Sequence, residues 1–129
     1  VFSWLAWSRG RYTEFGELIT GHVLTVSFAT VAELRAGAVK AGWGTARRER
    51  LASLLRTYVI LTPTDAVTQQ FAELYARFKG RLRGDGINDM WIAACALGQP
   101  VSPALVTGNL ADFQLVATSF PLRLVHPDL

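Results

Sequence analysis

The sequence predicts an α/β fold with a central, mainly parallel sheet. Short runs of aliphatic and β-branched residues alternate along the chain with longer amphipathic segments, which is the pattern of strands joined by helices. The 129 residues are enough for one domain with a substantial core. The hydrophobic share of 50% and the charged share of 18% indicate a globular chain rather than a disordered one.

Glycine and proline divide the first half of the chain into its expected elements. Gly21 and Gly42 are expected to end helices, and Pro63 is expected to close a strand. The strand residues are of the kind that fills a parallel sheet. The expected elements are a helix over residues 2–7, a helix over 12–19, a strand over 22–28, a helix from Thr30 to near Gly42, a helix from 45 or 46 that includes Leu51, Leu54 and Leu55, and a strand over 58–61.

A long amphipathic helix opens the second half of the chain. Asp65 is expected to cap it, and its inner face carries Val67, Phe71, Leu74 and Phe78. Beyond it, the apolar runs are shorter and are separated by polar turns. The expected elements are a helix over residues 65–78, a basic, glycine-rich stretch over 79–86, a helix over 88–97, a strand over 104–106, a helical step over 110–113 and a strand over 122–125.

Composition restricts the class of protein. The net charge is +3, and eleven of the thirteen basic residues are arginines. This is compatible with a polyanionic partner and suits phosphate, although a high-GC genome would give the same arginine bias. Cys95 is the single cysteine, so a protein of the reducing cytoplasm is expected. No apolar stretch reaches the roughly 18 residues that span a bilayer, and no secretory signal is visible, so no membrane association is expected.

Three acids are candidates for a functional site, and each also has an ordinary explanation. Glu33 stands three residues after Thr30, in the pattern of a capping box. Asp89 opens a helix, where a carboxylate complements the helix dipole. Asp112 lies in a polar turn, where a solvated acid is common. Taken one at a time, these residues do not indicate a site.

Spacing favours a shared role for the three acids. Asp89 shares its helical face with Ile92 and Ala93, so it is expected at the edge of the core. Glu33 and the 107–112 turn each follow a strand, which places them at the same edge of a parallel sheet. No lysine or arginine lies within one turn on either helical face, so no counter-charge is expected. Carboxylates without basic partners suit Mg²⁺ or Mn²⁺, and the absence of suitably spaced histidines and cysteines argues against zinc.

Three segments resemble the acidic motifs of PIN-domain ribonucleases of the VapC toxin type. Residues 27–34 (Ser-Phe-Ala-Thr-Val-Ala-Glu-Leu) resemble the second motif, in which a glutamate opens a helix after a strand. Residues 88–94 (Asn-Asp-Met-Trp-Ile-Ala-Ala) resemble the third, and residues 105–113 resemble the final Thr-x-Asn-x-x-Asp-Phe motif. Residues 41–44, with the arginine-rich helix after them, are also similar to VapC toxins. The motifs stand in the family's order, and the resemblance covers nearly all of the chain.

The resemblance implies a fold, a reaction and a set of site residues. The fold would be a three-layer α/β/α PIN-like domain over residues 1–129. The reaction would be hydrolysis of an RNA phosphodiester by water activated by Mg²⁺ or Mn²⁺. Glu33, Asp89 and Asp112 would be the catalytic metal ligands, directly or through water. Thr107 and Asn109 would orient Asp112 or a water molecule.

One acid of the family pattern has no counterpart in the sequence. The family's first acid ends the first strand, and residues 1–5 look like the residues that follow it. We therefore expect this strand and its aspartate upstream of Val1; otherwise the site lacks one ligand. Asp85 would be an accessory carboxylate or, as the better explanation, part of the Gly84–Gly86 turn.

The resemblance also implies partners. PIN toxins are generally homodimers that bind an antitoxin, here a VapB-like protein, and the substrate would be RNA. Trp4, Trp7 and Trp43 are candidates for stacking on unpaired bases or for lying under a partner, whereas Trp91 is expected in the core. The candidate phosphate contacts, each also explained as a solvated surface residue, are Arg35, Lys40, Arg47, Arg48, Lys79, Arg81 and Arg83.

The resemblance favours a growth-inhibiting endoribonuclease toxin, and two other functions are alternatives to it. A catalytically silent PIN-like module would bind protein or nucleic acid without cleaving RNA. A receiver-like signalling domain also gathers acids at a sheet edge, but it requires a lysine after a late strand. Because no lysine follows Lys79, we set the receiver aside.

Overall fold

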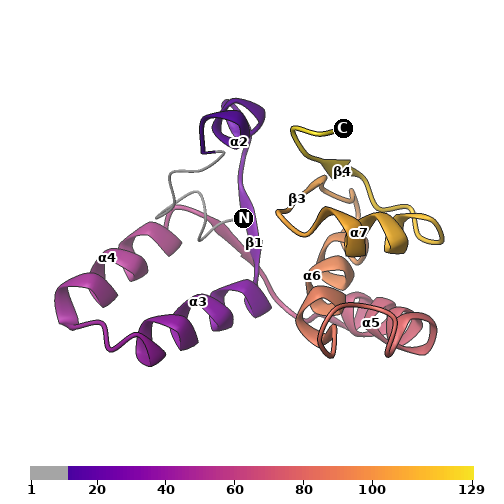
Figure 1. The fold of residues 1–129 in the computed structure, drawn as a ribbon, viewed down its shortest axis with the longest axis horizontal. Coiled ribbons are helices and arrows are strands. Elements are labelled where there is room, and N and C mark those ends of the chain that lie inside the picture. Colours follow the sequence, from indigo (N-terminus) through magenta and orange to yellow (C-terminus); the bar gives the residue numbers. More distant parts are fainter. Residues whose placement is uncertain (1–11) are drawn as a thin grey trace.

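The computed structural model describes residues 12–129, in which helices alternate with short strands (Figure 1). This arrangement confirms the predicted α/β class. The helix expected over residues 2–7 lies outside the described residues. Within residues 12–129, no helix has both the length and the apolar character needed to cross a membrane. The helices are α2 (Tyr12–Ile19), α3 (Phe28–Lys40), α4 (Thr45–Leu55), α5 (Asp65–Phe78), α6 (Ile87–Leu97) and α7 (Leu110–Ala117).

The strands of this part of the chain are two or three residues long: β1 (Thr25–Ser27), β2 (Val59–Leu61), β3 (Leu105–Val106) and β4 (Leu124–Val125). They pair in parallel, as predicted. β1 lies beside β2, with Val26 opposite Ile60, and β3 lies beside β4, with Val106 opposite Val125. Within residues 12–129 these pairs form two separate sheets rather than one continuous sheet.

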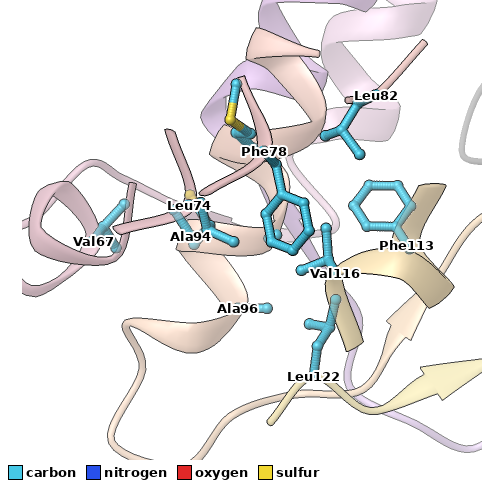
Figure 2. Packing of buried hydrophobic residues seen from close by; sticks show 12 residues of the cluster. Val67, Leu74, Phe78, Leu82, Ala94, Ala96, Phe113, Val116 and Leu122 are labelled. Atoms are coloured by element: carbon cyan, nitrogen blue, oxygen red, sulfur yellow. The ribbon is translucent and has the colours of Figure 1, made fainter. Parts of the chain in front are cut away.

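The larger hydrophobic core lies between α5, α6 and α7 (Figure 2). Leu74 and Phe78 of α5 and Phe113 of α7 are almost fully buried. The predicted inner face of α5 is therefore confirmed at these positions. Trp91 of α6 packs against this core and stacks on Phe71 with the ring centroids 3.9 Å apart, as expected for a core residue. This packing fixes α6 and α7 relative to each other.

A smaller hydrophobic core joins β1, α3 and α4. Its buried members include Val26, Val31, Leu51 and Leu55. Trp43, one of the candidates for base stacking, packs against this core instead of projecting into solvent. The other two tryptophan candidates lie outside the described residues.

Two helices begin with a different cap from the one expected. Ser27 rather than Thr30 caps α3, because its hydroxyl accepts a hydrogen bond from the Thr30 N–H at 3.1 Å. Thr64 rather than Asp65 caps α5 and accepts from the Val67 N–H at 3.3 Å. In both cases a hydroxyl residue stands in the extended position directly before the helix, from which it reaches the third N–H of the helix.

The turn before α6 is built by Asp85 and Gly86. The Asp85 Oδ1 accepts a hydrogen bond from the Ile87 N–H at 3.0 Å, so this carboxylate belongs to the turn, as the better explanation had it. Gly86 has a φ of 70°, and an added Cβ would lie 2.8 Å from the Cβ of Leu82. The helix consequently starts at Ile87, one residue earlier than expected.

A cavity of about 1210 Å³ opens between the two sheets. Its lining includes Val26 of β1 and Leu61 of β2 from one sheet, and Val106 of β3 and Val125 of β4 from the other, so both sheets border the same space. Glu33 and Asp89 also line it. Cys95 of α6 lines it too, with only 1% of its surface exposed, and burial raises the pKa of its thiol to about 11.

Candidate active site

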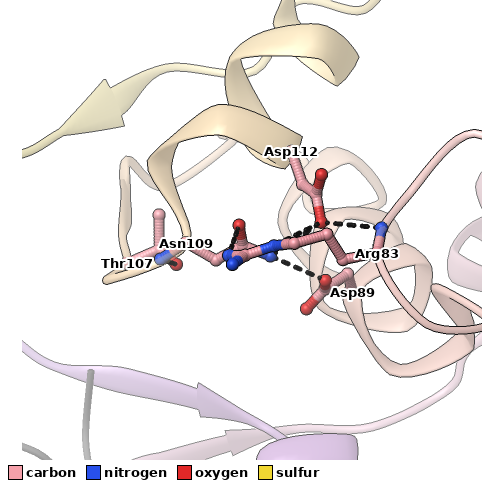
Figure 3. Close-up of polar contacts among 5 residues, drawn as sticks. All are labelled: Arg83, Asp89, Thr107, Asn109 and Asp112. Atoms are coloured by element: carbon pink, nitrogen blue, oxygen red, sulfur yellow. Dashed lines mark hydrogen bonds and ion pairs between the residues drawn. The ribbon is translucent and has the colours of Figure 1, made fainter.

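Asp89 and Asp112 are brought together by one side chain, Asn109 (Figure 3). Asp89 lies in the first turn of α6, Asp112 lies in the first turn of α7, and Asn109 directly precedes α7. The Asn109 Nδ2 donates to the Asp89 Oδ2 at 3.0 Å and to the Asp112 Oδ2 at 2.9 Å. The two predicted acids, 23 positions apart in the sequence, thus form an amide-bridged pair.

The amide bridge is itself held in place. The Thr107 Oγ1, which is buried at the end of β3, accepts a hydrogen bond from the Asn109 N–H at 3.0 Å. Because that bond fixes the backbone of Asn109, the side-chain amide is directed at the two carboxylates. Of the two predicted orienting residues, Asn109 therefore contacts both aspartates, whereas Thr107 contacts only Asn109.

Asp112 is buried and has several donors. Only 8% of its surface is exposed. Besides the amide of Asn109, its Oδ2 accepts from the Arg83 N–H at 3.1 Å and lies 3.7 Å from the Arg83 Nε. Burial alone would raise the pKa of Asp112, but these hydrogen bonds and the positive charge of Arg83 outweigh it and hold the pKa below its ordinary value. Asp112 is therefore ionised at neutral pH.

Asp89 and Glu33 have the opposite shift. Burial, followed by the negative charge of Asp112, raises the pKa of Asp89. Burial, as the larger cause, and the negative charge of Asp89 raise the pKa of Glu33. A hydrogen bond from the Asn88 side chain opposes this rise. The three acids therefore form a chain of electrostatic repulsion. Such an arrangement is relieved by a cation.

Glu33 is set apart from the amide-bridged pair. It lies on α3, its side chain is exposed, and it does not take part in the cap of its helix, which Ser27 forms. Among residues 12–129, no three acidic, histidine or cysteine side chains are grouped closely enough to hold a metal ion. The arrangement is therefore an amide-bridged pair, with Asp112 buried and Asp89 half-buried, and a third acid that lines the same cavity as Asp89.

The donor chemistry of the pair fits a hard divalent cation. The hydrogen bonds that residues 12–129 give to the pair end on Oδ2 of each aspartate, so the Oδ1 atoms take none of them. Two carboxylate oxygens that accept no hydrogen bond from residues 12–129, one from each aspartate, are the kind of ligand that Mg²⁺ and Mn²⁺ bind.

The expectation that the acids lack a basic partner is wrong. Arg83 belongs to the loop between α5 and α6, and its guanidinium donates to the Asn109 Oδ1 beside the pair (Figure 3). The sequence indicated Arg83 only as a candidate phosphate contact. Its contact with Asp112 was not predicted, because Arg83 lies 29 residues before Asp112 and outside the helical faces of the acids. The one available signal was the basic, glycine-rich character of the loop.

Among the seven candidate phosphate contacts, all of them in the described part of the chain, only Arg83 contacts the acidic pair. Arg47, Lys79 and Arg81 lie over the rings of Trp43, Tyr75 and Phe78. The exposed remainder consists of Arg35, Lys40 and Arg48.

Comparison with known proteins connects this site to a family. The family model described as PIN domain matches residues 1–109. That range includes Glu33 and Asp89 and ends at Asn109. A comparison with curated protein sequences gave no significant match.

Solved structures resemble the chain over nearly its full length. VapBC-1 from nontypeable Haemophilus influenzae is 25% identical with a TM-score of 0.72, and the match covers 93% of this chain and 89% of that one. VapBC2 from Rickettsia felis, bound to a DNA fragment from its promoter, is 24% identical with a TM-score of 0.72, covering 96% and 90%. DNA-bound VapBC from Salmonella typhimurium is 22% identical with a TM-score of 0.65, covering 96% and 89%. The last two similarities concern the fold alone.

Proposed function

This chain belongs to the PIN-domain family, whose members are generally metal-dependent nucleases, and we propose that it is an endoribonuclease that acts as the toxin of a toxin–antitoxin pair. The observation that carries the proposal is the amide-bridged pair of Asp89 and Asp112. Two carboxylates are held this close by an Asn, and the pKa of Asp89 is raised even though the Asn109 hydrogen bond and the charge of Arg83 oppose the rise. Both observations favour cation binding over a structural role.

Asp89 and Asp112 would hold Mg²⁺ or Mn²⁺, and Glu33 would contribute directly or through water. When bound, the divalent ion lowers the pKa of a water molecule and offsets charge that develops on the phosphate. Asn109 keeps the two aspartates at a fixed separation, and Thr107 keeps Asn109 in place. Asp112 remains ionised because of its hydrogen bonds, so one full negative charge is present at the site at neutral pH.

A fourth acid on a further strand belongs to this proposal. The sequence resemblance predicts a strand that ends in an aspartate, and strands of both sheets border the cavity. A parallel strand placed there would join the two sheets and would end beside Asp89 and Glu33, which line the same cavity.

The structural relatives support the proposal of an antitoxin partner, whereas the homodimer and the RNA substrate rest on the sequence resemblance. Each of the three similar structures is a VapBC complex, and two of them contain DNA. We infer that this chain binds a VapB-like antitoxin, forms a homodimer and cleaves RNA. The net charge of +3 is compatible with a nucleic-acid substrate.

Cleavage of an RNA pool by the full-length protein tests the function. We expect cleavage in Mn²⁺ or Mg²⁺, its loss in EDTA, and its loss in the Asp89→Asn variant. The matched control is Asp65→Asn, which changes an exposed aspartate at the start of α5. Full metal-dependent cleavage by Asp89→Asn would overturn the assignment of the site.

The alternative is a catalytically silent PIN-like module that binds protein or nucleic acid. It is favoured by one observation, that residues 12–129 contain no closed group of three metal-binding side chains. If the full-length protein binds its antitoxin or RNA but cleaves no RNA pool in either metal, this alternative replaces the nuclease.

A further inference from the structure

Arg83 is attached to the acidic pair in two independent ways. Its backbone N–H donates to the Asp112 Oδ2 at 3.1 Å, which anchors the loop. Its guanidinium donates to the Asn109 Oδ1, and its Nε lies 3.7 Å from the Asp112 Oδ2. The first attachment involves only the main chain, so the side chain can leave while the loop stays in place.

The guanidinium is the positive charge nearest to the pair in the described part of the chain. It lowers the pKa of Asp112 and opposes the rise in the pKa of Asp89. In this respect it does what a divalent cation would do. Because the guanidinium and a metal ion are both positive, they repel each other when both are beside Asp112.

The side chain of Arg83 is weakly held. It is 73% exposed, whereas that of Asp112 is 11% exposed. An ion pair open to water on one side contributes little stability, because water screens the charges and the long side chain loses freedom when it is held. A divalent ion that binds both aspartates therefore has only a weak competitor to displace.

We propose that Arg83 is an internal, displaceable counter-cation that competes with the divalent ion for Asp112. This inference rests on the proposed function, since it concerns the same metal site. It adds regulation: the guanidinium offsets part of the negative charge of the pair in the metal-free protein and sets the ion concentration at which the site fills. Arg83 is a positioning residue, because it acts through Asp112 and Asn109.

Binding of Mn²⁺ to the full-length protein, followed by electron paramagnetic resonance, tests the competition without any cleavage assay. We expect Arg83→Gln to lower the Kd for Mn²⁺ by about two- to fivefold at low salt, the range that corresponds to an exposed ion pair. Arg83→Lys retains the charge, so its Kd should stay close to that of the unmodified protein. Arg56→Gln is the matched control, because it removes an exposed arginine that is bonded to Ser53.

The salt dependence of Mn²⁺ binding distinguishes electrostatic competition by Arg83 from a structural effect of its replacement. At about 1 M KCl the screening length falls to roughly 3 Å, so the difference between Arg83→Gln and the unmodified protein should shrink. An Arg83→Gln protein with unchanged or weaker Mn²⁺ binding at low salt would overturn the proposal. So would a gain that is also present in Arg83→Lys, because that variant keeps the charge.

Asp112→Asn distinguishes this inference from the function on which it rests. If Asp112→Asn abolishes Mn²⁺ binding while Arg83→Gln leaves it unchanged, the metal site stands and only the role of Arg83 fails. If Asp112→Asn binds Mn²⁺ normally, the metal site itself fails.

Discussion

The two sides of the candidate active site lie in parts of the molecule that are packed differently. Asp89 and Asp112 lie on α6 and α7, which share the larger core with Phe78 and Phe113. Glu33 lies on α3, whose buried Val31 and Ala38 belong to the smaller core around Val26, and α3 also contacts α6. The geometry of the pair is thus set by a well-packed interior. The position of Glu33 depends on how α3 rests against α6.

This difference explains why two of the predicted ligands meet and the third stays apart. Within the larger core, helix packing leaves Asp89 and Asp112 little freedom, and Asn109 links them. Glu33 is exposed, and its side chain is hydrogen-bonded to the side chain of Asn88 rather than to Asn109. The site is therefore preorganised on one side and adjustable on the other.

Truncating a core side chain on each side gives the largest expected effects. Phe78→Ala in the larger core should lower the free energy of unfolding by about 3–5 kcal/mol, and Leu55→Ala in the smaller core by about 2–3 kcal/mol. The quantity is measured by urea denaturation, with the exposed Val39→Ala as a control expected to change it by less than about 0.5 kcal/mol. A larger loss for Leu55→Ala would contradict the ranking of the two cores.

Removing one acid from each side should reveal the same asymmetry in activity. Asp112→Asn is expected to lower kcat/KM for RNA cleavage about 100-fold or more, because it removes a preorganised ligand. Glu33→Gln is expected to lower it about tenfold, the effect of a residue that acts through water or a neighbour. Glu73→Gln, on the exposed face of α5, is the control. Equal losses for the two acids would show that Glu33 is as well placed as Asp112.

The turn at Gly86, which precedes Asp89, should be more sensitive to an added methyl group than the turn at Gly42, which follows α3. Gly86→Ala introduces a side chain at a φ of 70° and within 2.8 Å of the Leu82 Cβ, so we expect a loss of about 2 kcal/mol. Gly42 has a φ of 69°, but an added Cβ would have no heavy atom within 4 Å, so we expect Gly42→Ala to lower the free energy of unfolding by about 1 kcal/mol. Thermal unfolding compares the two, and a Gly42→Ala protein that is less stable than Gly86→Ala would contradict this account.

The smallest expected effect concerns pH. Burial and the charge of Asp112 raise the pKa of Asp89, so the folded protein binds a proton there more tightly than the unfolded chain. Stability is therefore lost as the pH rises from the ordinary value of 3.8 through the raised pKa. In EDTA, Asp89→Asn should be slightly more stable than the unmodified protein above this window and equal to it below. Thermal unfolding across pH checks this, with Glu49→Gln as a control, and a pH-independent difference would refute it.

Features that depend on nearby residues were predicted well from the sequence. The inner face of α5 follows from apolar residues at helical spacing, and Val67, Leu74 and Phe78 are buried as that spacing predicts. Asp89 was selected because motif and helical face agreed, and Asp112 because its motif and its place in a turn after a strand agreed; the structure brings both to one amide. Ser27 was missed as a cap because Ser27 and Thr30 are both hydroxyl residues near the helix start, and only the backbone conformation decides between them.

Features that depend on distant residues were not predictable in this way. The contact between Arg83 and Asp112 joins positions 29 apart through a glycine-rich loop, and no periodicity encodes such a path. The division of the strands into two sheets has the same origin, since strand pairing is set by the whole fold. Local patterns identified the acids, whereas tertiary packing determined their counter-charge.

The reactivity of the Cys95 thiol reports motion of the chain around the cavity between the two sheets. As the one thiol of the chain, with a pKa near 11 and 1% of its surface exposed, it reacts with disulfide reagents only when α6 is uncovered. Its rate of modification therefore measures how often the molecule opens at the cavity, without any introduced label. Any ligand or partner chain that closes the cavity would slow this chemistry in proportion to the closed population.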